Sequence, residues 1–114
     1  MKVNPAHLAP VGSFEEQVMV AVIRTGADAY GMSVRRELEK VTGRDVTIGS
    51  VYITLDRLEA KALVISDRVS AAGDVGSRRV FAVTPLGARA LAETRAMRDR
   101  LWHGVQLRPL LRHA

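Results

Sequence analysis

The chain has 114 residues and no cysteine. This length suits one domain with a single hydrophobic core. The lack of cysteine excludes disulfides, zinc–thiolate sites and cysteine nucleophiles. No apolar run approaches the roughly 18 residues that span a bilayer, and the N-terminal segment lacks the apolar stretch of a signal peptide. We therefore expect a soluble, cytoplasmic protein with no membrane partner.

The net charge of +5 and the sequence pI near 10.4 favour a nucleic-acid partner. The excess of positive charge is uneven, however, because residues 95–114 contain five arginines against a single aspartate. Most of the excess therefore lies in the C-terminal part of the chain. Bulk charge alone is weak support for DNA binding.

Residues 1–12 contain Pro5, Pro10 and Gly12, and we expect a flexible N-terminal arm there. Ser13 and Glu16 have the spacing of a capping box, which predicts a first helix from Ser13 to about Thr25. Its apolar side consists of Phe14, Val18, Met19, Val22 and Ile23. A second helix is predicted over residues 31–42, with Val34, Leu38 and Val41 on its apolar side and a stop at Gly43.

A third helix is predicted over residues 47–61, with Thr47 as its N-cap. At 3.6 residues per turn its apolar stripe is Ile48, Val51, Leu55 and Leu58, and its opposite face carries Ser50, Ile53, Thr54, Arg57 and Lys61. Two helices joined by a short turn that contains a glycine are typical of a helix-turn-helix, whose second helix reads DNA. We therefore expect the third helix to enter the major groove.

After Lys61 the apolar period changes. Leu63, Ile65 and Val69 partly alternate with polar residues, which predicts a half-exposed strand. A turn over residues 70–77 precedes a returning strand over residues 78–83, with Phe81 and Val83 facing the core. This hairpin directly behind the reading helix is interpreted as a wing.

Thr84 and Pro85 then predict the start of a final long helix. The apolar stripe of this helix consists of Leu86, Ala90, Leu91, Met97, Leu101 and Val105. The predicted fold is mainly α (α+β), a winged helix-turn-helix of order α-α-α-β-β-α. Residues 13–84 form the DNA-binding domain, residues 85–106 a dimerisation helix and residues 107–114 a basic tail.

Three strings, YGMSVRRELEK, IGSVYITLDRLEAKALV and GSRRVFAVTPLG, resemble the PadR family of bacterial transcriptional regulators. The resemblance covers residues 14–105. The chain departs from the family pattern at Val51, where leucine is common, at Ile53, where proline is frequent, and at Ala62, where glycine usually stands. The resemblance implies a homodimeric repressor without enzymatic activity. It also implies that Tyr52 lies toward DNA.

The candidate DNA-binding residues combine hydroxyl groups, which bond bases or phosphates, with basic groups, of which arginine bonds guanine in a fork. They are Thr47, Ser50, Tyr52, Thr54, Arg57, Lys61, Arg78 and Arg79. Alternation places Arg79 on the side of Phe81 and Arg78 on the other, so one is expected to reach DNA and the other to pair internally. Glu59 lies near the apolar stripe, and we predict an arginine partner for it, with Arg79 as a candidate.

The candidate dimer or ligand interface consists of Phe14, Val18, Met97, Leu101, Trp102 and Val105. Trp102 is either a dimer-core aromatic or, as the resemblance implies for some family members, a surface that stacks on a flat aromatic effector between two C-terminal helices. Glu15 and Glu16 are expected to pair with Arg95 and Arg98 of a partner subunit.

No metal, cofactor or catalytic site is expected, because the three histidines are scattered and no phosphate-binding glycine loop precedes a helix. The favoured function is a homodimeric transcriptional repressor that binds a near-palindromic operator and responds to a hydrophobic or aromatic small molecule. Two alternatives stay open at this point. One is a winged-helix module that binds protein, and the other is a small-molecule binding protein centred on Trp102.

Overall fold

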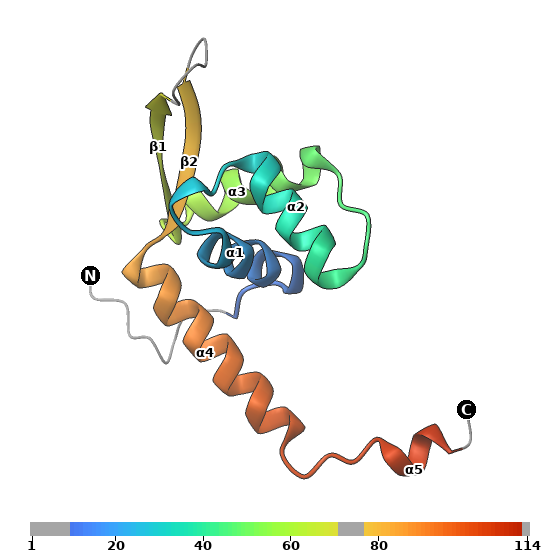
Figure 1. The fold of residues 1–114 in the computed structure, drawn as a ribbon. Coiled ribbons are helices and arrows are strands. Elements are labelled where there is room, and N and C mark those ends of the chain that lie inside the picture. The colour runs from blue at the N-terminus through green and yellow to red at the C-terminus, as the bar shows by residue number, and fades with distance from the viewer. Residues whose placement is uncertain (1–9, 71–76, 113–114) are drawn as a thin grey trace.

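The structure is a computed structural model, and it describes residues 10–70 and 77–112. The element order is α1 (Ser13–Thr25), the 3-10 turn η2 (Gly26–Asp28), α2 (Gly31–Thr42), α3 (Ile48–Ala60), β1 (Val64–Ser70), β2 (Ser77–Val83), α4 (Pro85–Trp102) and α5 (Arg108–Leu111) (Figure 1). The predicted order α-α-α-β-β-α is confirmed, with η2 and α5 added. Residues 1–9 of the predicted arm and residues 71–76 of the predicted wing turn lie outside the described residues.

The first helix starts differently from the prediction. Gly12, not Ser13, is the N-cap, because the carbonyl oxygen of Gly12 already accepts a bond from the Glu16 backbone N–H at 2.8 Å. The Glu15 carboxylate accepts a bond from the Gly12 N–H at 3.3 Å. The predicted pairing of Ser13 with Glu16 in a capping box is therefore wrong by one residue.

The core lies where α1, α2 and α3 pack against the base of the β1–β2 hairpin. Its largest fully buried side chains are Phe81, Met19, Leu55, Leu58, Val18, Val34, Val51 and Val64. Two residues expected in the core, Ile23 and Val41, are exposed instead. Each lies at the edge of its helix's apolar stripe and lines a surface groove.

The two strands pair antiparallel, with Val64 opposite Val83 and Ser66 opposite Phe81. The backbone N–H of Phe81 donates to the carbonyl oxygen of Ala29 at 2.7 Å, which attaches β2 to the segment just before α2. Ile65 and Val69, two of the three apolar residues in the predicted alternation, are both exposed. The strand begins at Val64, so a period of two residues turns Val64 inward and Ile65 outward.

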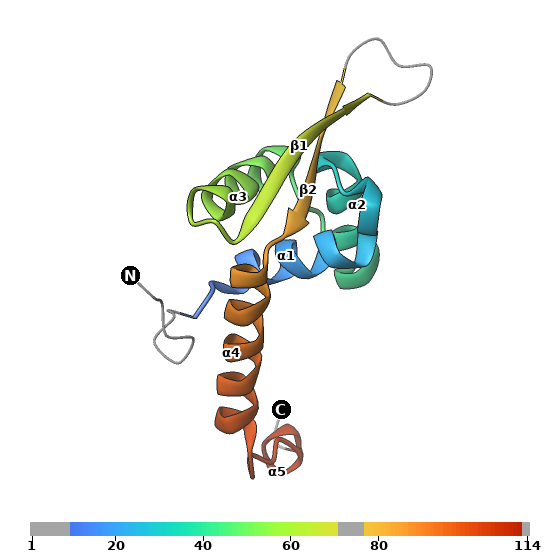
Figure 2. The same ribbon diagram turned by 90° about the vertical axis from the view of Figure 1, so that its left-hand side faces the viewer.

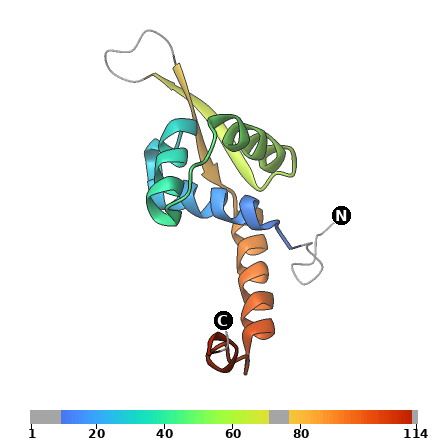
Figure 3. The same cartoon turned by 90° about the vertical axis from the view of Figure 1, so that its right-hand side faces the viewer.

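The last long helix begins as predicted. The Thr84 hydroxyl accepts a bond from the Gly87 N–H at 3.0 Å, and Pro85 is the first helical residue. Gly87, Ala90 and Thr94 are the buried residues of α4. The helix then projects from the body away from the wing, with α5 beyond its end (Figures 2 and 3).

This helix is shorter than predicted. It ends at Trp102, and Gly104 follows with a φ of +74°. A positive φ is incompatible with a continued right-handed helix, so Val105 lies outside the helix rather than on its stripe.

In the described part of the chain, no helix has both the length and the apolar character to cross a membrane.

Candidate nucleic-acid interface

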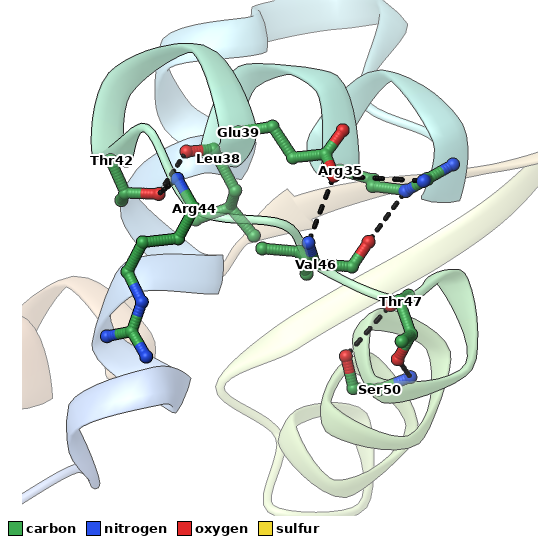
Figure 4. A network of polar contacts seen from close by, with 8 residues as sticks. All are labelled: Arg35, Leu38, Glu39, Thr42, Arg44, Val46, Thr47 and Ser50. Atoms are coloured by element: carbon green, nitrogen blue, oxygen red, sulfur yellow. Dashed lines mark hydrogen bonds and ion pairs between the residues drawn. The ribbon is translucent and has the colours of Figure 1, made fainter.

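The predicted N-cap of the reading helix is confirmed. The Thr47 hydroxyl accepts a bond from the Ser50 N–H at 3.2 Å, and the Ser50 hydroxyl donates to the Thr47 carbonyl oxygen at 2.8 Å (Figure 4). These reciprocal bonds satisfy polar groups at the start of α3. The two side chains fix the helix start, and each hydroxyl oxygen keeps a lone pair for a further donor.

The turn before α3 is held by charged side chains of α2. Arg35 donates from Nε to the Val46 carbonyl oxygen at 2.7 Å, and the Glu39 carboxylate accepts from the Val46 N–H at 3.0 Å (Figure 4). The Arg35 guanidinium group and the Glu39 carboxylate also form an ion pair, with 3.7 Å between nitrogen and oxygen. These two side chains of α2 therefore fix the backbone just before the reading helix.

One predicted DNA contact is misplaced. Thr54 is only 6% exposed, so its assignment to the outer face of α3 is wrong. The reason is helical spacing, because Thr54 follows Val51 by three residues and precedes Leu58 by four. Ile53, which the helical period had placed on the outer face but which was not among the candidate DNA contacts, is 55% exposed. An exposed aliphatic side chain suits the methyl group of thymine.

Tyr52 lies at the edge of the outer face, 39% exposed. Its ring lies so close to Gly31 that a Cβ atom at Gly31 would overlap the ring and the hydroxyl group. Gly31 permits this close approach of the Tyr52 ring, and its backbone has no unusual angle. The contact joins α3 to the start of α2, and it links two of the strings that carry the family resemblance.

Arg79 of the wing is the centre of an ionic network with α3. It donates to Asp56 at 2.8 Å, to the Glu59 carboxylate and to the Ser66 hydroxyl at 3.2 Å. Ser66 in turn donates to Glu59. The predicted arginine partner of Glu59 is thus confirmed as Arg79. The Arg79 side chain pairs internally, whereas we had included it among the candidate DNA contacts.

The same bonds account for the protonation behaviour of this network. The hydrogen bonds from Ser66 and then Arg79 lower the pKa of Glu59 below its ordinary value. The hydrogen bond to Asp56 raises the pKa of Arg79. Both shifts favour the charged forms of Glu59 and Arg79.

Arg78 points the other way, as alternation predicted. Its guanidinium carbon lies 4.4 Å from the centroid of the Tyr30 ring, just before α2. Arg36 of α2 reaches the same residue, with a hydrogen bond from its guanidinium group to the Tyr30 hydroxyl at 2.9 Å. The two adjacent arginines of the wing therefore contact different elements.

The two glutamates that we expected to pair with a partner subunit form ion pairs within the chain. Glu15 pairs with Lys61 at 2.9 Å, and Glu16 pairs with Arg98. The hydrogen bond from Lys61 lowers the pKa of Glu15. The assignment of Glu15 and Glu16 to a partner's arginines is corrected accordingly. The Lys61 side chain, a predicted DNA contact, is 55% exposed and ties the end of α3 to α1.

The predicted dimer or ligand residues fall into three groups. Val18 is 0% exposed and belongs to this chain's own core, so its placement at an interface is wrong. Phe14 and Met97 are half-buried. Leu101, Trp102 and Val105 are exposed, at 70%, 52% and 52%.

Within the described ranges, no three histidine, aspartate or glutamate side chains are grouped to hold a metal ion.

A three-helix unit with a capped outer helix, followed by a two-stranded wing, defines a winged helix-turn-helix protein. Residues 19–93 match the family described as the transcriptional regulator PadR-like family. The chain belongs to this family of DNA-binding transcriptional regulators, which are not enzymes.

Similarity to individual proteins agrees with this assignment. Transcriptional regulator Rv3488 of Mycobacterium tuberculosis is 35% identical over 86 residues, which cover 74% of this chain and 78% of the relative. A PadR family regulator from Eggerthella lenta superposes with a TM-score of 0.64 at 26% identity, covering 82% and 80% of the two chains. RosR of H. salinarum shares the fold, with a TM-score of 0.63, 22% identity, and coverage of 90% and 87%.

Proposed function

We propose that this chain is a homodimeric repressor that binds a near-palindromic operator and is released by a flat hydrophobic small molecule. Each protomer inserts α3 into the major groove. The direct contacts come from Thr47, Ser50, Tyr52 and Arg57, to which Ile53 is added in place of the buried Thr54. Two-fold symmetry gives half-sites spaced by about 34–36 Å or a multiple of this distance.

The observation that supports dimerisation is an exposed apolar segment at the C-terminal end. We call it the C-terminal apolar segment, and it consists of Leu101, Trp102, Val105, Leu107, Leu110 and Leu111. All six side chains are exposed, from 45% for Leu107 to 70% for Leu101 and Leu110. A concentration of large apolar side chains on an elongated projection marks an association surface. A second copy of the same segment is its proposed partner.

Sedimentation velocity at micromolar concentration tests the dimer. The wild-type protein is expected to sediment as a dimer, and Leu101→Asp as a monomer with unchanged helical content. Arg89→Ala, an exposed change near the start of α4, serves as the control and should remain dimeric. A monomeric wild-type protein would overturn the dimeric proposal.

The effector proposal draws on an open groove of about 480 Å³ between α1 and α4. Val20, Ile23 and Leu91 line the groove, with Arg95 and Arg98 at its margin. Trp102 lies further along α4. A flat aromatic molecule held in this groove and against Trp102 would contact α4. In the proposed dimer, α4 sets the distance between the α3 helices of the two protomers.

Phenazine, an uncharged flat aromatic compound, is a suitable probe. We expect it to quench Trp102 fluorescence and to weaken binding to operator DNA in the same concentration range. Quenching without any change in DNA affinity would contradict a regulatory role. Trp102→Ala removes the ring that would stack on phenazine, so any effect of phenazine on DNA binding that persists in this variant is nonspecific.

The operator is tested by fluorescence anisotropy on DNA from upstream of the protein's own gene, at several salt concentrations and with competitor DNA. Tight binding that resists competitor is expected, with log affinity falling linearly against log salt by about 0.9 per phosphate contacted. Transcription in vitro from the same DNA should decrease when the protein is added. Increased transcription would contradict the assignment as a repressor.

A further inference from the structure

A groove of about 330 Å³ lies between α1 and α2, which pack side by side (Figure 1). We call it the α1–α2 groove. Its apolar lining consists of Val20 and Ala21 of α1 and of Leu38 and Val41 of α2. Ala21 and Leu38 are buried, whereas Val20 and Val41 are 40% and 55% exposed. Two large aliphatic side chains therefore face solvent here, outside the reading helix and the wing.

Helical spacing sets the order of side chains along the α1–α2 groove. Val20 precedes Arg24 by four residues on α1, so the two form one row along this helix. On α2, Val41 follows Glu37 by the same interval. Arg24 and Glu37 form an ion pair at 3.1 Å, and the two valines lie one helical turn, about 5.4 Å, further along the groove. The groove thus has a charged end and an aliphatic middle.

The ion pair at the charged end leaves donors and an acceptor open. Arg24 donates through Nε to Oε1 of Glu37. Within residues 10–70 and 77–112, the two terminal nitrogens of Arg24 and Oε2 of Glu37 form no further hydrogen bond. The terminal N–H groups of an arginine have the spacing of a carboxylate, which they bind as a fork. A carboxylate oxygen such as Oε2 accepts a hydrogen bond from an ammonium group.

The charges at this end match a zwitterion. A ligand with a carboxylate alone would bind Arg24 but lie beside the like charge of Glu37, and an amine alone would bind Glu37 but lie beside Arg24. A molecule that carries both groups on one carbon atom satisfies both partners. The volume of about 330 Å³ is near the lower limit of small-molecule sites, which suits a compact ligand.

We infer that the α1–α2 groove is a binding site for a free α-amino acid with a branched aliphatic side chain. The α-carboxylate binds the terminal nitrogens of Arg24, the α-ammonium group binds Glu37, and the side chain lies between Val20 and Val41. The described residues that line the groove include no aromatic side chain, which favours an aliphatic ligand. The site goes beyond the proposed function, because the groove between α1 and α4 does not include Arg24, Glu37 or Val41.

The ion pair at the other end of the α1–α2 groove provides an internal contrast. Arg98 of α4 donates to Glu16 through Nη1, which is one of its two terminal nitrogens. A carboxylate fork through both terminal nitrogens of Arg98 would have to share this group with Glu16. Arg24 keeps both of its terminal nitrogens for the ligand, so we assign the amino-acid head group to Arg24.

Isothermal titration calorimetry of the full chain with L-leucine tests the site. For a ligand of nine non-hydrogen atoms, we expect a dissociation constant between about 10 μM and 1 mM. Three matched compounds each lack one feature. They are 4-methylpentanoate without the ammonium group, 3-methylbutylamine without the carboxylate, and glycine without the side chain. Each should bind at least about tenfold more weakly than leucine, because one charged or apolar contact is lost.

Variants locate the binding in the α1–α2 groove. Arg24→Gln and Glu37→Gln should each weaken leucine binding by at least about tenfold. Arg24→Lys keeps the charge without the fork and should give an intermediate affinity. Arg100→Gln and Asp99→Asn remove the same charges from exposed positions near the end of α4, and both should bind leucine as wild type does. Thermal unfolding without ligand checks the fold of every variant, and leucine should raise the Tm of wild type but not that of Arg24→Gln.

The outcomes decide the proposal without using DNA, so its failure and that of the proposed function are distinguishable. No binding at about 10 mM leucine would overturn the site. Equal affinity for leucine and 4-methylpentanoate would overturn the assignment to an amino acid. Unchanged affinity in Arg24→Gln and Glu37→Gln would place the ligand elsewhere. Binding by Leu101→Asp but not by wild type would show that a second copy covers the groove, which would also overturn the proposal.

Discussion

Arg79 of β2 and Glu59 of α3 form an ion pair across 20 residues of sequence, and this pair connects the wing to the reading helix. Asp56 and Ser66 extend the connection to another turn of α3 and to β1. The Arg79 guanidinium carbon also lies 4.8 Å from the centroid of the Phe81 ring, a fully buried core side chain. The wing is thereby held at a fixed angle to α3, which is what simultaneous contact with two grooves requires.

Arg79→Gln should uncouple the wing from α3. About a third of each partner's side chain is exposed, so we expect a loss of only about 1–2 kcal/mol in the free energy of unfolding. Operator affinity should fall because the wing loses its orientation, while the salt slope stays at the wild-type value because no phosphate contact is removed. Denaturant unfolding and anisotropy titrations measure the two effects.

Arg57→Gln is the matched comparison, since Arg57 is an exposed arginine on the outer face of α3. It should lower operator affinity with little change in stability. A reduced salt slope in Arg79→Gln would show that Arg79 contacts a phosphate, and the structural assignment of its role would then be incorrect.

The Glu59 carboxylate should make the protein less stable in acid. Hydrogen bonds from Ser66 and Arg79 lower the pKa of Glu59 below its ordinary value of 4.5. A carboxylate with a lowered folded pKa stabilises the fold above that ordinary value, and the contribution disappears as pH falls through the folded pKa. Glu59→Gln should therefore be less stable than wild type at neutral pH, with a difference that shrinks below pH 4.5.

Urea denaturation at a series of pH values measures this difference. Ser66→Ala removes one of the two hydrogen-bond donors and should give a smaller loss in the same pH window. A difference between Glu59→Gln and wild type that stays constant from neutral to acidic pH would rule out the linkage.

Local signals in the sequence were sufficient for most of the fold. The N-caps at Thr47 and Thr84 and the stop at Gly43, which has a φ of +69°, depend on residues within four positions of each helix end. Such features are set by backbone hydrogen bonding and are readable from the chain. The family resemblance then added the assignment as a regulator, which periodicity alone does not provide.

The errors arose where the outcome depends on contacts distant in sequence. Thr54 had a favourable polar character for the outer face, but the packing of α3 rotates it inward. The bond from Arg35 to the carbonyl oxygen of Val46, in the turn before α3, joins residues 11 positions apart and was not predicted. The contact between Arg78 and the Tyr30 ring likewise requires β2 to lie beside the start of α2, which only the folded chain specifies.

Ala62 marks a position where the sequence departs from the family pattern although the backbone conformation favours glycine. Its φ is +61°, and the bonds from Leu63 to Leu58 and from Ala62 to Glu59, both 2.9 Å, form a Schellman motif that closes α3. Left-handed geometry costs a non-glycine residue about 1–2 kcal/mol. Glycine loses roughly 0.4–1 kcal/mol more chain entropy on folding. The net expectation for Ala62→Gly is a stabilisation of about 0.5–1 kcal/mol.

Thermal unfolding should show this as a rise in Tm of about 2–5 °C. Ala92→Gly is the control, because Ala92 is exposed within α4, where glycine lowers helix stability by about 1 kcal/mol. A Tm decrease in both variants would mean that the strain at Ala62 is relieved in solution by some local rearrangement.

Gly87 and Gly31 both accept a close neighbour, and the nature of that neighbour predicts different outcomes for alanine. A Cβ at Gly87 would overlap the carbonyl oxygen of Leu63, which is backbone and also accepts a bond from the Thr84 N–H at 3.1 Å. The Leu63 carbonyl group and the Thr84 N–H group cannot move unless α4 is displaced from the base of the β1–β2 hairpin. Gly87→Ala should therefore lower the free energy of unfolding by about 1–3 kcal/mol.

A Cβ at Gly31 would instead meet the ring of Tyr52, a side chain that is 39% exposed and free to rotate outward. Gly31→Ala should consequently cost less than about 1 kcal/mol, because the new methyl group displaces one flexible side chain and no backbone. The displaced Tyr52 ring would leave its position beside Gly31 on the DNA-facing side of α3, so DNA affinity should fall although the fold is intact. Tyr52→Phe separates the hydroxyl from the ring, and it should retain the packing on Gly31 while losing any phosphate bond. If Gly31→Ala unfolds the protein as severely as Gly87→Ala does, then Tyr52 is fixed by more than this contact, and its ring is part of the structural core and not a movable element of the DNA-facing surface.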